Sequence, residues 1–221
     1  MKRWRESLFA MVAWRYAAHA VMVALALLNE PRPAATLHDA LLAALPFSEW
    51  VQRHNYHLWL AAYGPVAFWL LARDRAACLR FLWVGGWLSL LRGATILLVP
   101  LGPVDGRDVN VGASASTLWR AWLGIVDPVT ALCTDVPHAA LTKDLFFSGH
   151  VSTTFLLWLY CRGKGAIAPV ALAGHLLVVA TVLIGRVHYT VDVVGAWAIT
   201  LAAYALAERR RAAVAAPVLA P

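Results

Sequence analysis

Two short stretches of the sequence carry residue types that suit phosphoryl transfer. One is Ser148-Gly149-His150, and the other is His188 with Asp192 four residues later. Residues four apart share one face of a helix, so the Asp192 carboxylate can accept from one ring nitrogen of His188. The other ring nitrogen is then free to attack phosphorus. His150 is the candidate general acid and base, which protonates the leaving oxygen and deprotonates the acceptor.

Polar residues beside these stretches are candidates for binding a phosphate group. Ser148 is a good N-cap, Gly149 lets the backbone approach a ligand, and the free amides of a helix start favour an anion. Lys143 and Arg186 are near enough in the sequence to offset phosphate charge. Asp144 either orients the site or caps the helix that follows it. The sequence contains no carboxylate cluster, so we expect no metal ion and no cofactor.

Each of these features also has an ordinary structural explanation. A histidine at a membrane edge is most often an interfacial polar residue, and we assign His19, His57 and His175 to that class. An i,i+4 His–Asp pair can simply stabilise a helix, and a Ser-Gly step is common at helix starts. Catalysis is favoured because both stretches are expected at the same face of a membrane.

The composition predicts a membrane protein. The chain of 221 residues is 61% hydrophobic, with several apolar runs of about 20 residues, the length that crosses a hydrocarbon core of roughly 30 Å. The net charge of +7 comes from short basic clusters beside these runs, which excludes a nucleic-acid-binding stripe. We predict an all-α, six-helix transmembrane bundle forming one domain over residues 1–221. The six spans are expected at about 9–28, 57–72, 81–101, 145–160, 167–184 and 191–207.

The basic residues also orient the predicted bundle. One alternating set of segments holds eleven of them, and the opposite loops, although much longer, hold six. The eleven are Lys2, Arg3, Arg5, Arg73, Arg75, Arg80, Arg162, Lys164, Arg209, Arg210 and Arg211; the six are Arg32, Arg53, Arg107, Arg120, Lys143 and Arg186. The positive-inside rule therefore predicts cytoplasmic termini and an exoplasmic site. In a bacterium, that site would face the periplasm from the inner membrane.

Two arginines fall inside predicted spans. A charge at mid-membrane costs about 2.5–3.5 kcal/mol on insertion scales, so Arg15 and Arg92 are expected to face the bundle interior or a wet cavity. Arg92 has two open interpretations, a contact with a head group or phosphate and an internal pair with a carboxylate. Arg15 is assigned a structural role.

Two outer segments contain apolar runs that are too short to span. Residues 37–50 are expected to form a short helix in the membrane interface. Residues 118–126 form a second run, which Asp127-Pro128 ends. We expect it to be a lid or interfacial helix that admits lipid from the outer leaflet.

Three stretches of the chain resemble one family of enzymes. They are Asp144-Leu145-Phe146-Phe147-Ser148-Gly149-His150, His188-Tyr189-Thr190-Val191-Asp192-Val193-Val194, and Leu91-Arg92-Gly93-Ala94-Thr95 followed by Pro100. At these residues the sequence resembles the sphingomyelin synthase branch of the type-2 phosphatidic acid phosphatase superfamily. The likeness covers about residues 90–204, and the first 80 residues match only in hydropathy.

This resemblance implies a six-helix membrane enzyme with an exoplasmic site. Such enzymes transfer a phospho-alcohol head group from a glycerophospholipid to ceramide and release diacylglycerol. Carried over by motif, His188 is the nucleophile, Asp192 its orienting partner, and His150 the acid and base. The phospho-head group would rest on His188 until the primary hydroxyl of ceramide, or water, takes it.

Departures from the family patterns favour the synthase branch over the plain phosphatases. The phosphatase branch has an Arg six residues before the second His, where this chain has Val182, and Arg186 stands only two residues before His188. The Cys-Gly that usually precedes the Asp of the synthase motif is Thr142-Lys143 here. The donor and acceptor therefore remain open on the sequence.

Three functions follow as alternatives. The leading one is a metal-independent transferase that moves phosphocholine or phosphoethanolamine from a glycerophospholipid to ceramide or a related lipid alcohol. The second is a lipid phosphate phosphatase of the same fold, with water as acceptor. The third is a catalytically silent membrane protein that binds or transports lipid. The expected partners are the bilayer and the two lipids, with no nucleic acid; a homo-oligomer is compatible with this interpretation.

Overall fold

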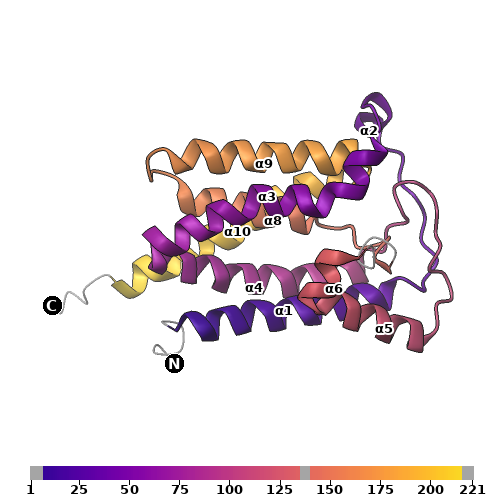
Figure 1. The fold of residues 1–221 in the computed structure, drawn as a ribbon, viewed down its shortest axis with the longest axis horizontal. Helices are drawn as coiled ribbons and strands as arrows, with labels where there is room; N and C mark the ends of the chain where they lie inside the picture. Colours follow the sequence, from indigo (N-terminus) through magenta and orange to yellow (C-terminus); the bar gives the residue numbers. More distant parts are fainter. Residues whose placement is uncertain (1–6, 135–139, 216–221) are drawn as a thin grey trace.

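The computed structural model describes residues 7–134 and 140–215, and the elements in these ranges are all helices (Figure 1). They are α1 (Leu8–Asn29), α2 (Ala40–Ala44), α3 (Glu49–Arg73), α4 (Arg75–Leu98), α5 (Ala115–Val126), α6 (Pro128–Cys133), α8 (Gly149–Cys161), α9 (Ile167–Ile184) and α10 (Thr190–Ala215). The all-α prediction is confirmed for the described part of the chain.

Several helices begin at a Ser or Asp whose side chain accepts a hydrogen bond from the first turn. Ser48 caps α3 through the amide of Val51 (3.3 Å), and Asp74 caps α4 through the amide of Ala77 (2.9 Å). These bonds satisfy amides that have no partner within the helix, so they define where each helix starts. Asp74 also ends α3, because its own amide donates to the carbonyl of Leu70.

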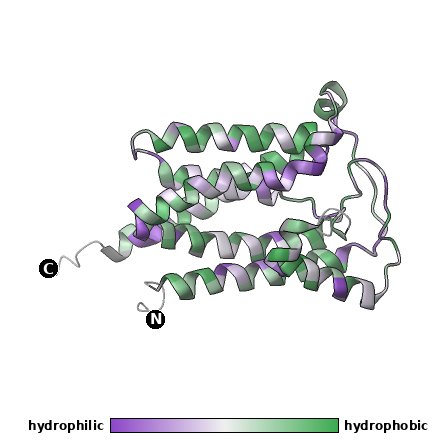
Figure 2. Cartoon of the chain, viewed as in Figure 1, coloured by the Kyte–Doolittle hydropathy of each residue, from purple (hydrophilic) through white to green (hydrophobic). Residues whose placement is uncertain are grey.

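Four helices are long and apolar enough to cross a membrane, namely α1, α4, α9 and α10, which is consistent with a multi-pass membrane protein. The other two predicted spans fall on α3 and α8. Helix α3 starts eight residues before the predicted edge and opens with a polar turn that includes Gln52 and Arg53; α8 has only 13 residues. The count of six spans therefore stays a prediction. Figure 2 shows the apolar residues along the shafts of the long helices.

The long helices run side by side along the long axis of the molecule (Figure 1). Helix α8 packs against α4, α9 and α10, while α1 packs along α4 and α3 along α9. Small residues let α1 and α4 approach closely: a Cβ at Gly86 would lie 2.1 Å from Nε1 of Trp14. Only glycine fits there, and close packing through small residues is a common way for membrane helices to associate.

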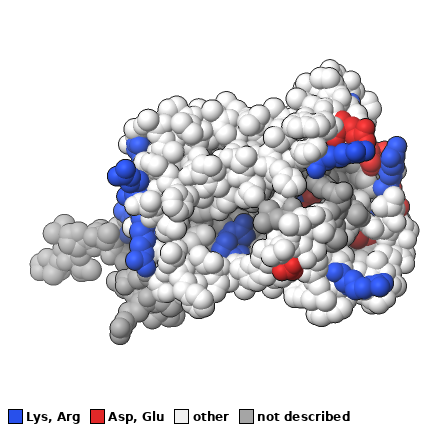
Figure 3. Space-filling model, in the orientation of Figure 1, with Lys and Arg blue, Asp and Glu red and all other residues white. Residues whose placement is uncertain are grey.

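Charge is distributed unequally between the two ends of the bundle. Figure 3 shows Lys and Arg gathered at the end where both chain termini lie, and a mixture of basic and acidic side chains at the other. Helices α8 and α10 begin at that mixed end, which carries the two His-containing stretches. Lys2, Arg3 and Arg5, which contribute to the predicted orientation, lie outside the described residues. The orientation of the bundle in the membrane stays a prediction.

The outer segments form short helices. Residues 37–50 contain α2 and the start of α3, and the run at 118–126 lies within α5. Helix α5 packs against α1, where the indole of Trp122 donates to the carbonyl of Ala20 (2.9 Å). The predicted break at Asp127-Pro128 is confirmed, since Asp127 ends α5 and caps α6. The role of α5 as a lid stays a prediction.

Candidate active site

The two His-containing stretches are joined directly through the backbone. The amide of Ser148 donates to the carbonyl of Asp192 (3.1 Å), which ties the start of α8 to the first turn of α10. Ser148 is the N-cap of α8, with its hydroxyl accepting from the amide of Val151 (3.4 Å). The imidazole rings of His150 and His188 lie 6.1 Å apart between centroids. The structure thus brings together the two histidines that the sequence singled out.

Asp192 holds one side of the His188 ring. Its Oδ2 lies 3.3 Å from Nδ1 of His188 and accepts from the amide of Tyr189 (2.9 Å). Both side chains are buried, with exposures of 2% and 0%. When Nδ1 donates to the carboxylate, the lone pair of the neutral ring is on Nε2. This is the arrangement that a nucleophilic imidazole requires.

His150 lines a large pocket between the helices. The cavity has a volume of about 550 Å³ and is enclosed by residues of α1, α3, α4, α5, α6 and α8 together with the 141–147 segment. Its walls are largely apolar and aromatic, and the ring of Trp59 stands edge-on to that of His150 at 5.4 Å. His188 is not part of the lining but lies against His150. A ligand in this pocket would therefore meet His150 before His188.

Arg92 holds the segment that leads into α8. Its Nη1 pairs with Oδ1 of Asp144 (2.7 Å), its Nη2 donates to the carbonyl of Asp144 (2.9 Å), and its Nε donates to the carbonyl of Phe147 (2.6 Å). A Cβ at Gly149 would lie 3.1 Å from that Nε, so glycine leaves room for the guanidinium. Of the two interpretations of Arg92, the internal ion pair is present. Asp144 likewise orients this segment, while the cap of α8 is Ser148.

Lys143 does not line the large pocket. Its side chain is buried, its Nζ pairs with Asp108 (2.6 Å) and donates to the carbonyl of Arg32 (2.7 Å), and its amide donates to Glu30 (2.7 Å). These contacts connect the outer segments to the start of the motif. The predicted contact between Lys143 and phosphate stays a prediction, and the ammonium group already has a carboxylate partner.

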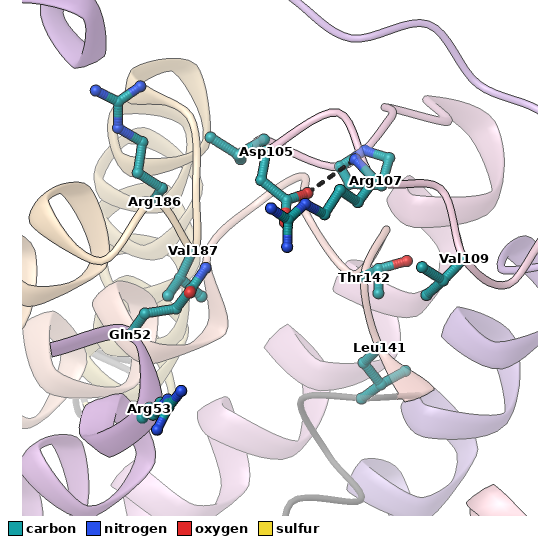
Figure 4. A pocket seen from close by; sticks show the side chains of 11 residues that line it. Gln52, Arg53, Asp105, Arg107, Val109, Leu141, Thr142, Arg186 and Val187 are labelled. Carbon is teal, nitrogen blue, oxygen red and sulfur yellow. Dashed lines mark hydrogen bonds between the residues drawn. The ribbon is translucent and has the colours of Figure 1, made fainter. Parts of the chain in front are cut away.

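Arg186 lines a second cavity at the polar end of the bundle (Figure 4). This cavity has a volume of about 390 Å³, and its lining includes Arg53 and Arg107. Arg186 has a left-handed backbone (φ 53°), and its guanidinium donates to the carbonyl of Leu45 (3.4 Å). Figure 4 shows that guanidinium directed away from the one of Arg107. Arg186 therefore lies two residues before His188 in the sequence but lines a different cavity from the one that His150 lines.

Asp39 contacts the start of α10, which the sequence did not reveal. Its carboxylate accepts from the amide (2.6 Å) and the hydroxyl (2.9 Å) of Thr190 and also caps α2. Burial raises the pKa of this carboxyl, but the hydrogen bonds from Thr190, Leu42 and Leu41 outweigh burial and hold the pKa below its usual value. The cap of α2 was readable from the sequence; the bond to Thr190, 151 residues away, was not.

Glu30 and Tyr189 were also missed. Glu30 is buried and accepts from the amide of Lys143, the hydroxyl of Thr142 (2.8 Å) and the amide group of Asn110 (2.8 Å); burial raises its pKa. The Tyr189 hydroxyl donates to the carbonyl of Gly102 (3.0 Å), and burial raises the pKa of that phenol. Through these hydrogen bonds, both residues connect outer segments to the two motifs. Their partners are too distant in the sequence for any local pattern to reveal them.

A comparison with known families gives a match over the segment that carries both histidines. Residues 143–209 match the family model described as PAP2 superfamily C-terminal. The matched segment begins at Lys143 and runs into α10, so it contains both histidines, Asp192 and the bond between the two motifs. No curated protein matches the chain. The matched segment is thus similar to the type-2 phosphatidic acid phosphatase superfamily, whose members are generally phosphatases and phosphotransferases, and the four apolar helices are consistent with that similarity.

Proposed function

We propose that this protein is an integral-membrane lipid phosphotransferase that works through a phosphohistidine on His188. The proposed donor is a glycerophospholipid carrying phosphocholine or phosphoethanolamine, and the proposed acceptor is ceramide or a related lipid alcohol. The main support is the His188–Asp192 pair, whose ring lies 6.1 Å from that of His150 at the edge of an apolar pocket.

The proposed reaction has two steps of the same kind. In the first, Nε2 of His188 attacks phosphorus, the bond to the glycerol oxygen breaks, and His150 gives that oxygen a proton, releasing diacylglycerol. In the second, His150 takes the proton of the acceptor hydroxyl, whose oxygen displaces His188 from phosphorus. Asp192 holds Nδ1–H of His188 throughout and stabilises the positive charge that develops on the ring. We expect no metal ion or cofactor to take part.

Lipid rather than water is the proposed acceptor because of the pocket that His150 faces. Its walls are mainly apolar, and Figure 3 shows a hollow on the side of the bundle rather than at an end. Val182 and Arg186 also depart from the phosphatase pattern. Hydrolysis is the second candidate, because the Arg-lined cavity at the polar end reaches Val187, next to His188, and would give water a short path.

A product assay in proteoliposomes tests the proposal. Phosphatidylcholine or phosphatidylethanolamine is offered with fluorescent ceramide, and phosphatidic acid is offered separately and scored for free phosphate. A new, more polar ceramide product that depends on His188 and persists in EDTA is the expected result. Phosphate release without that product would assign the hydrolase, and EDTA inhibition reversed by a divalent ion would overturn the metal-free mechanism. Unchanged lipid handling in both His150→Ala and His188→Ala would favour the non-catalytic lipid-binding protein.

A further inference from the structure

Arg15 is a charged side chain within the membrane-spanning helix α1, and it lines the same pocket as His150. Its Nη1 donates to the hydroxyl of Ser89 on α4 (2.8 Å). It forms no ion pair with any residue in the described ranges 7–134 and 140–215. A cation in this position is costly in a membrane and is usually found where a function needs it. The mechanism above does not use it.

The packing of α1 on α4 directs this guanidinium toward the active site. A Cβ at Gly85 would lie 3.2 Å from Nε of Arg15, so the side chain passes over α4 where that helix has no side chain of its own. It then reaches Ser89, four residues nearer to the end of α4 that faces the two histidines. Arg92 follows Ser89 by three residues and lies on the same face. The backbone positions of Ser89 and Arg92 are therefore separated by about one helical turn, roughly 5 Å along the axis of α4.

Charge distinguishes the two arginines. Arg92 is neutralised by Asp144, and its Nε and Nη2 donate to backbone carbonyls. Arg15, Arg92 and Asp144 are the Lys, Arg, Asp or Glu residues among the described residues that line the pocket, so its net charge is +1 when the histidines are neutral. The carboxylate of Asp144 neutralises the positive charge of Arg92. An occupant that carries a negative charge would balance the other.

The surroundings indicate what that occupant is. The lining near Arg15 is apolar and aromatic, with Val12 and Tyr16 from α1, Tyr63 from α3 and Val126 from α5. Figure 3 shows Lys or Arg atoms within a hollow on the side of the bundle, away from both ends. A hollow on the side of a membrane-embedded bundle faces lipid rather than water. The anionic group of a phospholipid is its phosphate, whose oxygens match the fork of donors that a guanidinium presents.

We propose that Arg15, held in place by Ser89, binds the phosphate group of a phospholipid in a subsite beside Ser89, which precedes Arg92 by about one turn of α4. A lipid that arrives from the side of the bundle occupies this subsite on its way to His150 and His188. The movement of the lipid on to His150 and His188 rests on the proposed function. The binding of a lipid phosphate by Arg15 is independent of that function.

Lipid binding to a variant that cannot turn over tests this subsite. In a His188→Ala background purified in detergent, fluorescent phosphatidic acid and diacylglycerol with the same acyl chains are titrated and followed by anisotropy. Arg15→Gln should weaken phosphatidic acid binding at least tenfold and leave diacylglycerol binding unchanged. Arg15→Lys keeps the positive charge but lacks the paired N–H donors of a guanidinium, so its affinity for phosphatidic acid should fall about three- to fivefold. Arg120→Gln removes a cation from the exposed face of α5 and should change neither affinity.

Two results would overturn the proposal. Equal phosphatidic acid affinity in Arg15→Gln and its parent would show that Arg15 binds no phosphate. A parallel loss for both lipids would show that Arg15 only maintains the shape of the pocket. Ser89→Ala keeps the charge of Arg15 and removes its hydroxyl partner, so it gives a second measurement if Arg15→Gln does not fold. This variant should bind phosphatidic acid more weakly and diacylglycerol with unchanged affinity. Since no turnover is involved, failure of the proposed reaction would appear separately, in the proteoliposome assay.

Discussion

Single residues at the site are held by more than one contact each. Asp192 accepts from His188 and from the amide of Tyr189, and its carbonyl accepts from Ser148. Arg92 makes three contacts with the 144–147 segment. Because these groups are buried, the loss of one partner leaves another polar group without its hydrogen bond or charge partner. Substitutions at this scale should therefore have effects that can be assigned to named contacts.

His188→Ala should abolish turnover and the covalent phosphoenzyme together. His188 is the proposed nucleophile, so no acceptor for phosphorus remains in the variant. Asp192→Asn should keep the fold and lower kcat by about 10²–10⁴, because an amide no longer favours the required tautomer. The measurement is labelling with a donor that carries radioactive phosphate, quenched in alkaline SDS because a phosphohistidine is labile in acid, beside steady-state rates. A label retained by His188→Ala would move the nucleophile to another residue.

The Arg92–Asp144 pair should be energetically coupled. Arg92→Met leaves a largely buried carboxylate without its partner and should lower the free energy of unfolding by about 3 kcal/mol. Asp144→Leu should have a similar effect, and the double variant should recover at least about 1 kcal/mol of the summed loss. Reversible unfolding by SDS in mixed micelles measures the cycle. Strict additivity would mean that the two side chains do not interact.

At the scale of elements, the site is a junction between helix ends. Helix α8 starts at Ser148, α10 starts beside His188, and the amide of Ser148 donates to the carbonyl of Asp192. The 31–39 segment adds a second connection, because Asp39 accepts from Thr190 at the start of α10. The positions of the two histidines therefore depend on caps and turns rather than on the helix shafts.

Asp39→Ala should lower both stability and kcat. It removes the cap of α2 and two bonds to Thr190, a loss of about 1–2 kcal/mol at pH 7. Because folding lowers the pKa of Asp39, its ionised form stabilises the native state above the ordinary value of 3.8. This contribution disappears as the pH falls through the lower pKa of the folded state, so the difference between the variant and the parent should shrink there.

A second cap provides the control for Asp39. Asp127 caps α6 through the amide of Thr130 (2.8 Å) and, within the described ranges, makes no hydrogen bond or ion pair with either motif. Asp127→Ala should therefore leave kcat unchanged, with unfolding followed from pH 7 to pH 3 for both variants. If Asp39→Ala also kept the parental kcat, the tie to Thr190 would have no part in positioning His188.

The whole molecule is a bundle with two unlike ends and a pocket that opens on its side. The polar end with mixed charges carries the His pair and the Arg-lined cavity, and the other end carries mainly Lys and Arg (Figure 3). Such an asymmetry is what the positive-inside rule uses, and it predicts cytoplasmic termini. A lipid could then reach the site from the bilayer while water reaches it from the exoplasmic side.

Labelling from outside intact cells tests this orientation. In a variant without Cys78, Cys133 and Cys161, a membrane-impermeant maleimide should modify Val111→Cys, at the end that carries the histidines. It should not modify Ala212→Cys, near the C-terminus, until the cells are opened. Both positions are exposed in the fold. The reverse pattern would place the active site in the cytoplasm.

Local patterns in the sequence were sufficient for the helical class, for several helix edges and for the contact between His188 and Asp192. The four apolar helices, the Ser148 cap and the His188–Asp192 pair all depend on residues within about one turn of each other, so spacing alone predicts them. Only the tertiary structure decided that Ser148 meets Asp192, that Arg92 pairs with Asp144, that Lys143 turns to Asp108, and that Arg15 reaches the pocket. These partners are brought together by helix packing, which depends on shape complementarity over the whole bundle and leaves no short-range periodicity in the chain.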